Sequence, residues 1–257
     1  EAPVQVVDVR REDMRLGGAG NVVNNLLALG AGVSVCSVIG GDENGAILRH
    51  AFAGKGADVT GVFEDPLRMT SKKTRVLAAN QQIVRIDRET REDISTGLEE
   101  RILDFVANGK NHWDIILVSD YGKGLLTSRV LAGVIGSAKQ RGIPVVVDPK
   151  GANYAKYRGA TLITPNRREA EVASRVSIKD ADSLHRAAEC LLAEGAYDAL
   201  LITRSSEGMS LFFPGGADVH IPTVAREVYD VTGAGDTVVA TLGVGLACGL
   251  SFELAAR

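Results

Sequence analysis

The chain carries the stretch Asp230-Val-Thr-Gly-Ala-Gly-Asp-Thr237, followed at once by an apolar run of small residues, 237–247. The run predicts a helix, and Gly233 and Gly235 allow a tight turn before it, so that backbone N–H groups lie at a helix N-terminus. Unpaired donors and a partial positive charge at such an end favour a phosphate. Asp236 places a carboxylate inside this cradle, which suits a base beside a phosphoryl acceptor. A helix N-cap aspartate in a Gly-rich turn is the alternative.

Short apolar runs alternate with helical patterns along the rest of the chain. The expected strands are 33–39, 115–119, 144–148, 161–164 and 199–203, and the expected helices are 21–29, 45–53, 96–107, 128–140, 167–174 and 181–193. This order predicts an α/β fold with a mostly parallel sheet, helices on both faces and ligands at the carboxyl ends of the strands.

Two stretches break this alternation. Residues 4–9 alternate weakly between apolar and polar, and 73–79 with 82–87 predict a hairpin that turns at Asn80-Gln81. An ordinary excursion from the main sheet is the alternative for both.

Composition bounds the class of protein. The chain has 257 residues, 45% hydrophobic and 24% charged, which is enough for a large core, and its net charge of −3 argues against nucleic acid as a partner. The three cysteines, Cys36, Cys190 and Cys248, lie in apolar runs without C-x-x-C spacing, so we expect buried thiols in a reducing compartment. No run approaches the ~18 to 20 apolar residues of a membrane span, and we expect a cytoplasmic protein without a membrane partner.

The stretch that ends at Asp236 resembles the second signature, D-x-x-G-A-G-D, of the ribokinase-like (PfkB-type) sugar kinases. A second match is Gly17-Gly18-Ala19-Gly20-Asn21, followed by a run to Gly30. It resembles the family's first signature, a G-G-x-x-x-N turn and helix that cradle the sugar. The resemblance implies a ribokinase-like α/β fold, ATP as the phosphoryl donor, and sugar contacts from Gly17, Gly18 and Asn21.

The resemblance also implies a small β lid over the sugar, formed here by segments of about 1–16 and 72–88. In the family such a lid is often a dimer contact, so we expect a homodimer. The whole chain, 1–257, is expected to be a single kinase domain that is incomplete at both ends. The family's first core strand and its closing helices have no match, and the chain stops inside a helix that Ser251 is expected to cap.

Within the family, several strings are similar to the D-glycero-β-D-manno-heptose 7-phosphate kinases. They are 74–77, 80–87, 119–124, 147–151 and 164–166. This resemblance implies transfer of a phosphoryl group from ATP to the 1-hydroxyl of heptose 7-phosphate, in the synthesis of ADP-heptose for lipopolysaccharide. The alternatives are a kinase of another sugar or sugar phosphate, such as fructose 6-phosphate or a pentose, and a non-catalytic sugar- or nucleotide-binding module.

Basic residues gather in and beside the expected lid, although the whole chain is acidic. They are Lys72, Lys73, Arg75, Arg85 and Arg88. A lid over a phosphorylated sugar would use such cations, whereas a neutral sugar would not need them. The alternative is a solvated edge strand defended by charges. We expect sugar-phosphate contacts from Lys73, Arg75, Asn80 and Arg85.

Further candidates follow the expected strands. Asp120 is expected to accept sugar hydroxyls or, alternatively, only to form a turn, and Lys123 could reach a phosphate. Lys150 is expected at an ATP phosphate or the sugar phosphate. Asn166 and Glu169 match the family's N-x-x-E element and lie three apart at a helix start, which suits Mg²⁺ held partly through waters. A capping box is the alternative, and the two are compatible.

The string Thr203-Arg-Ser-Ser-Glu-Gly208 departs from the T-x-G-x-x-G of many family members. Ser205 replaces the first Gly, so we expect a wider turn, with Thr203 and Gly208 as nucleotide contacts.

The resemblance implies in-line transfer with Asp236 as the base. Backbone N–H groups from Gly233, Ala234, Gly235 and Asp236 would hold the developing charge, and Mg²⁺ would bridge the ATP phosphates.

Overall fold

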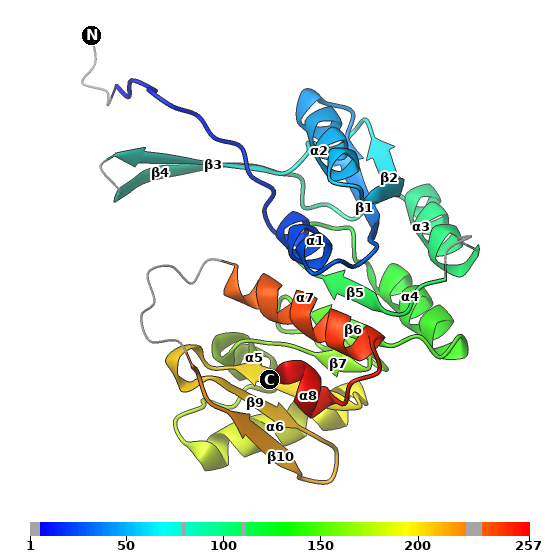
Figure 1. Cartoon of the computed structure of the whole chain (residues 1–257), viewed down its shortest axis with the longest axis vertical. Helices are drawn as coiled ribbons and strands as arrows, with labels where there is room; N and C mark the ends of the chain where they lie inside the picture. The colour runs from blue at the N-terminus through cyan, green and yellow to red at the C-terminus, as the bar shows by residue number, and fades with distance from the viewer. Residues whose placement is uncertain (1–5, 79–80, 109–111, 225–232) are drawn as a thin grey trace.

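The computed structural model of the chain describes residues 6–78, 81–108, 112–224 and 233–257, and a six-stranded sheet forms its centre (Figure 1). The strand order is β10 (Asp218–Ile221), β9 (Met209–Phe212), β8 (Ala199–Thr203), β7 (Leu162–Ile163), β6 (Val145–Asp148) and β5 (Ile116–Ser119). Strands β5 to β8 are parallel, whereas β9 and β10 are antiparallel. The predicted mostly parallel sheet is therefore confirmed, with two antiparallel strands at one edge that the sequence patterns did not predict.

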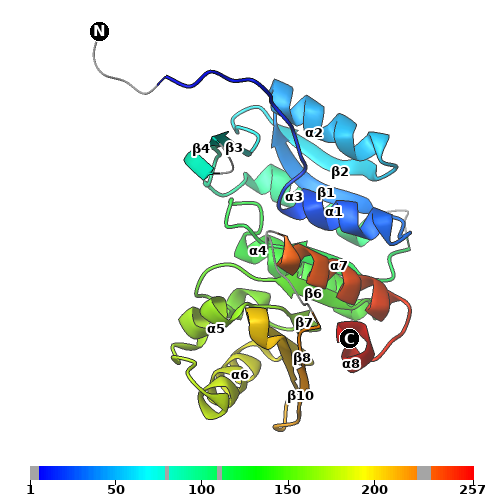
Figure 2. The same ribbon diagram turned by 60° about the vertical axis from the view of Figure 1, so that its left-hand side comes forward.

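Helices cover both faces of this sheet, as predicted (Figure 2). One face packs against α4 (Ser128–Gln140), α5 (Arg167–Ser174) and α6 (Ala181–Gly195), and the other against α1 (Ala19–Ala28), α7 (Ala234–Ala247) and α8 (Phe252–Ala256). Successive residues of a strand point to opposite faces, so Val145 and Val147 enter one core and Val146 enters the other. The strands read as continuous apolar runs because both of their faces are buried.

A second, two-stranded parallel sheet pairs β1 (Ser34–Gly40) with β2 (Asp58–Asp65), and α2 (Glu43–Gly54) connects the two strands. Helix α3 (Thr96–Asn108) packs against this pair. Strand β2 was not predicted, because its charged ends and central Gly61 resemble a turn. In the structure a Cβ on Gly61 would lie 2.7 Å from the ring of Phe105, so the glycine lets α3 approach the strand.

The predicted hairpin is confirmed as β3 (Lys72–Ala78) and β4 (Gln81–Arg88), which pair antiparallel. Gln81 pairs with Ala78 and so belongs to the strand rather than to the turn. Asn80 lies outside the described residues. Every residue of β4 is exposed, and the hairpin projects away from the helices (Figure 1).

The strand expected near residues 4–9 is wrong for the part that the structure describes. Residues 6–17 form neither helix nor strand, and 1–5 lie outside the described residues. A strand needs a neighbour for its backbone hydrogen bonds, and no strand pairing of this segment occurs within the described ranges.

The predicted helices are all present, with ends that differ by at most three residues. The largest difference is at α7, which begins at Ala234 instead of 237. Ser251 caps α8 by accepting a hydrogen bond from the N–H of Leu254. Two short 3-10 helices are also present, η1 (Ala155–Tyr157) and η2 (Ser205–Glu207). Throughout the described ranges, every helix is too short or too polar to cross a membrane.

The prediction of buried thiols is wrong for two of the three cysteines. Cys190 and Cys248 are exposed, because one lies on the outer side of α6 and the other follows the end of α7. Cys36 in β1 is partly buried, and burial raises the pKa of its thiol to about 12. All three cysteines are free.

Candidate active site

Polar residues converge at one edge of the main sheet, where its parallel strands end. Asp120 follows β5, Asp148 ends β6, Asn166 follows β7 and Thr203 ends β8. The N–H of Asp120 donates to the carbonyl of Asp148 at 3.0 Å, and the N–H of Thr203 donates to the carbonyl of Pro165 at 3.0 Å. The carboxyl ends of adjacent parallel strands therefore bring the predicted residues Asp120, Asn166 and Thr203 to one edge, together with Asp148, which was not predicted.

The two glycine-rich signatures meet above this edge. Gly233, with φ 82°, caps α7, and Asp236 lies in the first turn of that helix. Asn21 on α1 donates from Nδ2 to Oδ2 of Asp236 at 2.8 Å, across 215 residues of sequence. A Cβ on Gly233 would lie 2.6 Å from Asn21 Nδ2, so only glycine permits both the backbone angle and this contact. Helices α1 and α7 lie side by side in both views (Figures 1 and 2).

Asp236 has a second donor that the sequence patterns did not predict. The hydroxyl of Tyr121, in the loop after β5, donates to Oδ1 of Asp236 at 2.9 Å. Burial and the neighbouring Asp236 raise the pKa of the Tyr121 phenol, so it stays protonated as a donor. The Tyr121 ring lies against Gly18, where an added Cβ would come within 3.2 Å of ring atoms. The sequence shows that Tyr121 follows a strand, but it does not show which residues the side chain contacts.

Asp120 has the contacts of a turn former. Its side chain is 4% exposed, and Oδ1 accepts from the N–H of Gly122 at 2.7 Å. Oδ2 accepts from Lys156 Nζ at 2.6 Å and from the Tyr157 hydroxyl at 2.6 Å. The structure thus favours the turn-forming alternative for Asp120 over a direct contact with sugar hydroxyls. Lys156, which neutralises its charge, and Tyr157, which donates a hydrogen bond to it, were not among the predicted residues.

Asp148 is a further group that sequence reasoning did not single out. Burial, followed by the negative charges of Glu169 and Asp236, raises the pKa of its carboxyl to about 7. Asp120 adds to this effect, and Lys150 opposes it. The strand-end edge thus holds a surplus of negative charge, which a divalent cation would neutralise.

Asn166 and Glu169 form a capping box at the start of α5. Asn166 Oδ1 accepts from the N–H of Glu169 at 3.0 Å, and Glu169 Oε2 accepts from the N–H of Asn166 at 3.2 Å. Lys150 Nζ lies 2.7 Å from the other carboxylate oxygen, Oε1. The capping alternative is confirmed. Across the described ranges, no three His, Cys, Asp or Glu side chains are grouped to ligate a metal ion directly. The prediction that Asn166 and Glu169 hold Mg²⁺ partly through waters does not require such a group.

The loop after β8 is a tight turn, so the expected widening at Ser205 is wrong. The N–H of Arg204 donates to the carbonyl of Gly208 at 2.8 Å, and the N–H of Gly208 donates to the carbonyl of Ser205 at 3.1 Å. Ser205 has φ 52°, the left-handed conformation that glycine adopts more readily. A Cβ on Gly208 would lie 2.1 Å from the carbonyl oxygen of Ile221, so this glycine also allows β10 to pack closely.

Two of the basic residues of the hairpin, Lys73 and Arg85, are paired with acidic residues of the same segment. Lys73 Nζ lies 3.0 Å from Asp87 and 3.1 Å from Glu89, and Arg85 Nε lies 2.9 Å from Asp87. Lys123, from the loop after β5, also pairs with Glu89. Hydrogen bonds from Lys123, then Arg91 and Lys73, lower the pKa of the Glu89 carboxyl to about 2. The charge argument from the sequence did not include Asp87 and Glu89. The ion pairs join Lys73, Arg85 and Lys123 to these two acidic residues and not to Asp236.

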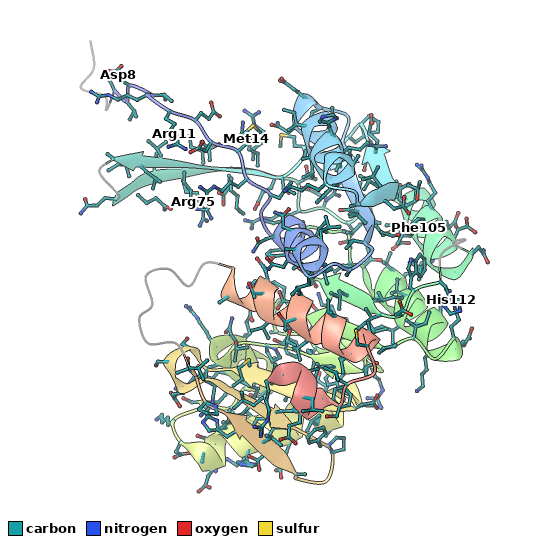
Figure 3. All side chains as sticks on the ribbon, in the orientation of Figure 1. Asp8, Arg11, Met14, Arg75, Phe105 and His112 are labelled. Carbon is teal, nitrogen blue, oxygen red and sulfur yellow. The ribbon has the colours of Figure 1, made fainter. Side chains whose placement is uncertain are left out.

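Arg75 lies on the hairpin, directly opposite Arg85 in the strand register (Figure 3). Like charges at opposed positions of two strands repel each other. Asn80, the remaining predicted lid contact, lies outside the described residues.

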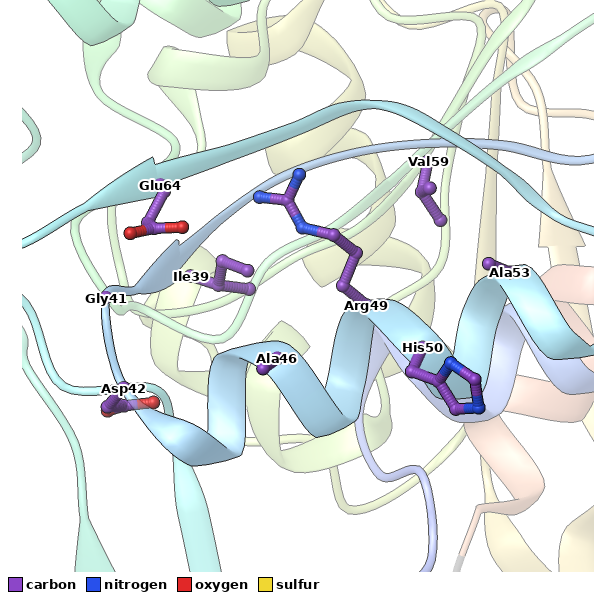
Figure 4. A pocket seen from close by; sticks show the side chains of 9 residues that line it. All are labelled: Ile39, Gly41, Asp42, Ala46, Arg49, His50, Ala53, Val59 and Glu64. Atoms are coloured by element: carbon purple, nitrogen blue, oxygen red, sulfur yellow. The ribbon is translucent and has the colours of Figure 1, made fainter.

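A separate open hollow of about 620 Å³ lies beside α2, against β1 and β2 (Figure 4). Its charged lining residues are Asp42, Arg49 and Glu64. None of the residues predicted for the site lines it.

Comparison with known proteins gives this arrangement a family. The sequence profile described as "pfkB family carbohydrate kinase" matches residues 2–257. The chain belongs to this family. The two segments that resemble the signatures of this family contact each other through Asn21 and Asp236.

The chain is 71% identical over its full length to a protein of Geotalea uraniireducens named "Bifunctional protein HldE", of which it covers 52%. It is 65% identical, again over its full length, to the protein of the same name from Geobacter sulfurreducens, with 52% of that protein covered. The chain thus spans about half the length of these pfkB relatives.

Solved structures share the fold at low identity. The tetrameric inhibited form of phosphofructokinase-2 from Escherichia coli has a TM-score of 0.83 and 19% identity, with 100% of this chain and 84% of that chain covered. Arabidopsis thaliana ribokinase, in a complex with ribose and ATP, has a TM-score of 0.78 and 20% identity, with 98% and 81% covered. These similarities show the ribokinase-like fold.

Proposed function

We propose that the chain is an ATP-dependent kinase of D-glycero-β-D-manno-heptose 7-phosphate, acting on the 1-hydroxyl to give the 1,7-bisphosphate. The observation that carries this proposal is the carboxylate of Asp236 in the first turn of α7, bonded to Asn21 of the other signature. The strings that resemble heptose 7-phosphate kinases support the choice of sugar. The identity of up to 71% to bifunctional HldE proteins over the whole chain supports it further.

Asp236 performs the proton transfer in this mechanism. It accepts the proton of the sugar hydroxyl while that oxygen forms a bond to the γ-phosphorus, and the bond from this phosphorus to the β–γ bridging oxygen breaks to release ADP. The backbone N–H groups of Gly233, Ala234, Gly235 and Asp236 lie at the positive end of α7 and stabilise the charge that develops. A base of this kind contributes roughly 10²- to 10⁴-fold in rate.

The nucleotide side of the site is assigned to residues at the strand ends. Lys150, whose side chain is 52% exposed, is the proposed contact of a phosphate, and Thr203 and Gly208 are the proposed contacts of the nucleotide. Asn166 and Glu169 would hold Mg²⁺ partly through waters, and the negative charge that raises the pKa of Asp148 supports a cation there. Bound Mg²⁺ supplies positive charge to the transferring phosphoryl group.

The sugar side of the site is assigned to the first signature and the hairpin. The proposed contacts are Gly17, Gly18, Asn21, Lys73, Arg75, Asn80, Arg85 and Lys123, and Asp120 is left out because its carboxylate is buried in the turn. Lys73 and Lys123 support a phosphorylated sugar, because both converge on one anion, Glu89, at the base of the hairpin. The phosphate of the sugar would replace the Glu89 carboxylate as the counter-ion of these two lysines.

A second copy of the chain is the proposed partner, through the hairpin. Exposed apolar side chains on its strands include Leu77, Ile83, Val84 and Ile86, with exposed fractions of 62%, 49%, 43% and 57%. A two-stranded hairpin is marginal by itself, so a second copy that covers this surface would stabilise it. The double substitution Ile83→Asp and Ile86→Asp should convert a dimer to a monomer in light scattering, and a monomeric wild-type protein would contradict the proposal.

The activity is tested by incubating the protein with ATP, Mg²⁺ and one of three sugars: the heptose 7-phosphate, fructose 6-phosphate or ribose. Phosphorus NMR then gives the position of the new phosphate. A 1,7-bisphosphate from the heptose alone, lost when EDTA removes Mg²⁺, is the expected result. Turnover of another sugar would overturn the substrate, and no turnover of any sugar would favour a binding module.

A further inference from the structure

We propose that Tyr121 is a positioning residue for the base, and that its hydroxyl holds the carboxylate of Asp236 in the orientation that accepts the sugar proton. This inference rests on the proposed function and adds a residue to which neither glycine-rich signature assigns a role. The hydrogen bond of 2.9 Å joins Asp236 to a loop 115 residues away in sequence.

The two oxygens of the Asp236 carboxylate are held from two different elements. Asn21, on α1, donates to Oδ2, and Tyr121, after β5, donates to Oδ1. One donor on each oxygen fixes the rotation of the carboxylate plane, which a single donor would leave free. Each oxygen still has lone pairs that can accept a proton from the substrate.

The backbone that carries Tyr121 is anchored on one side by the buried turn before it. Asp120 accepts the N–H of Gly122 at 2.7 Å, and Lys156 and Tyr157 hold the same carboxylate at 2.6 Å each. Gly122 has φ 61°, so the chain reverses immediately after the tyrosine. The side chain of Tyr121 therefore leaves a fixed turn.

The other side of the loop is tied to the base of the hairpin. The carbonyl of Gly124 accepts the N–H of Ile94 at 2.9 Å, and the carbonyl of Lys123 accepts a guanidinium N–H of Arg68. A Cβ on Gly124 would lie 1.9 Å from the carbonyl oxygen of Glu92, so the two segments are in direct contact. The loop thus has little freedom to move Tyr121 away from Asp236.

The ring of Tyr121 is held in place by packing, in addition to the contacts of its backbone. It packs over Gly18, where a Cβ would come within 3.2 Å of the ring, so the absence of a side chain at Gly18 makes room for it. Tyr121 is still 39% exposed. Gly18, expected from the sequence to cradle the sugar, therefore also supports the residue that orients the base.

The test compares Tyr121→Phe with the wild-type protein and with Tyr197→Phe as a matched control. Tyr197 is buried, and its hydroxyl donates to the carbonyl of Tyr154 at 2.8 Å, so the control also loses one hydroxyl hydrogen bond. With the heptose 7-phosphate, Tyr121→Phe should lower kcat about 10- to 100-fold, as for the loss of one hydrogen bond to a charged group. KM should change less than about 3-fold, because the substrate contacts remain. An unchanged kcat would overturn the proposal.

A second measurement does not depend on turnover. In protein labelled with ¹³C at the aspartate carboxyls, the Asp236 signal is identified by its loss in Asp236→Asn, and its chemical shift at pH 7 is compared between the variants. Loss of the Tyr121 hydroxyl as a donor should move the Asp236 carboxyl signal in Tyr121→Phe, while Tyr197→Phe leaves it unchanged. An identical Asp236 chemical shift in wild type and Tyr121→Phe would refute the positioning role even if the protein phosphorylates no sugar.

Discussion

Replacing Lys156 with Met should destabilise the protein much more than replacing an exposed lysine. Lys156 is the charge partner of Asp120, whose side chain is 4% exposed, and the two atoms are 2.6 Å apart. Met keeps the length of the side chain but removes the positive charge. A buried carboxylate is then left without its counter-ion, which is the costly way to break such a pair.

The expected loss follows from the remaining contacts. Removing one partner of a fully buried pair costs about 3–5 kcal/mol, but Asp120 keeps two donors, the N–H of Gly122 and the hydroxyl of Tyr157. The Lys156 side chain is also 20% exposed, so water already weakens the pair. We therefore expect Lys156→Met to cost about 2–3 kcal/mol in free energy of unfolding. Asp120→Asn should cost about 1–2 kcal/mol, because the lysine can turn to water and no buried charge remains.

Urea unfolding at pH 7, followed by circular dichroism, measures these values, with Lys179→Met as the exposed control. The double variant Asp120→Asn with Lys156→Met should be less destabilised than the sum of the single variants by about 1–2 kcal/mol, because neither charge is then left alone. If the free energy of unfolding of Lys156→Met lies within about 0.5 kcal/mol of that of Lys179→Met, the Asp120 carboxylate does not depend on Lys156 as the contacts indicate.

Three further substitutions test other parts of the structure. Ala196 ends α6 at φ 49°, so Ala196→Gly should raise the free energy of unfolding by about 0.5–1 kcal/mol in urea, whereas Ala193→Gly inside the helix should lower it by about 1 kcal/mol. The pKa of Glu89 is lowered to about 2 from 4.5, so its ion pairs stabilise the fold above pH 4.5 and are lost as the pH falls toward 2. The difference in Tm between wild type and Glu89→Gln should therefore shrink between pH 5 and pH 2.5, and a constant difference would contradict the ion pairs. Gly233→Ala places a Cβ 2.6 Å from Asn21 Nδ2 and should lower kcat at least about 10-fold in a coupled ADP assay, whereas Gly97→Ala, with open space around it, should not.

The sequence predicted the parts of the fold that have regular apolar patterns. Strands β5 to β8 are buried on both faces and read as apolar runs, and α4 and α5 begin and end at the predicted residues. Strand β2 was missed because Gly61 and its acidic ends resemble a turn, although that glycine is required by the packing of Phe105. Tertiary packing, not local propensity, decided that segment.

The site was predictable where a residue is fixed by its own backbone, and not where it depends on a distant partner. The glycine-rich turns place Asn21 and Asp236 at helix starts, and the structure brings the two together. Tyr121 acts across 115 residues, and the raised pKa of Asp148 arises from burial and from charges on other elements. Neither long-range contact leaves a local pattern in the sequence.

The hairpin shows a different limit. Its cations were counted without Asp87 and Glu89, which lie in or beside the same strands. The register places Asp87 opposite Lys73, and the ion pairs follow from that register. A charge count along the sequence cannot show which cations remain available for a ligand, because pairing depends on which residues face each other.

The central claim is that Asp236 is the base of a sugar kinase, and Asp236→Asn tests it most directly. The measurement is the turnover of heptose 7-phosphate with ATP and Mg²⁺ by wild type and variant, beside calorimetric binding of the sugar phosphate to each protein. The account predicts that the variant loses at least about 10²-fold in kcat while binding changes only a few-fold. A variant that retains turnover within a few-fold of wild type would contradict the assignment of Asp236 as the base.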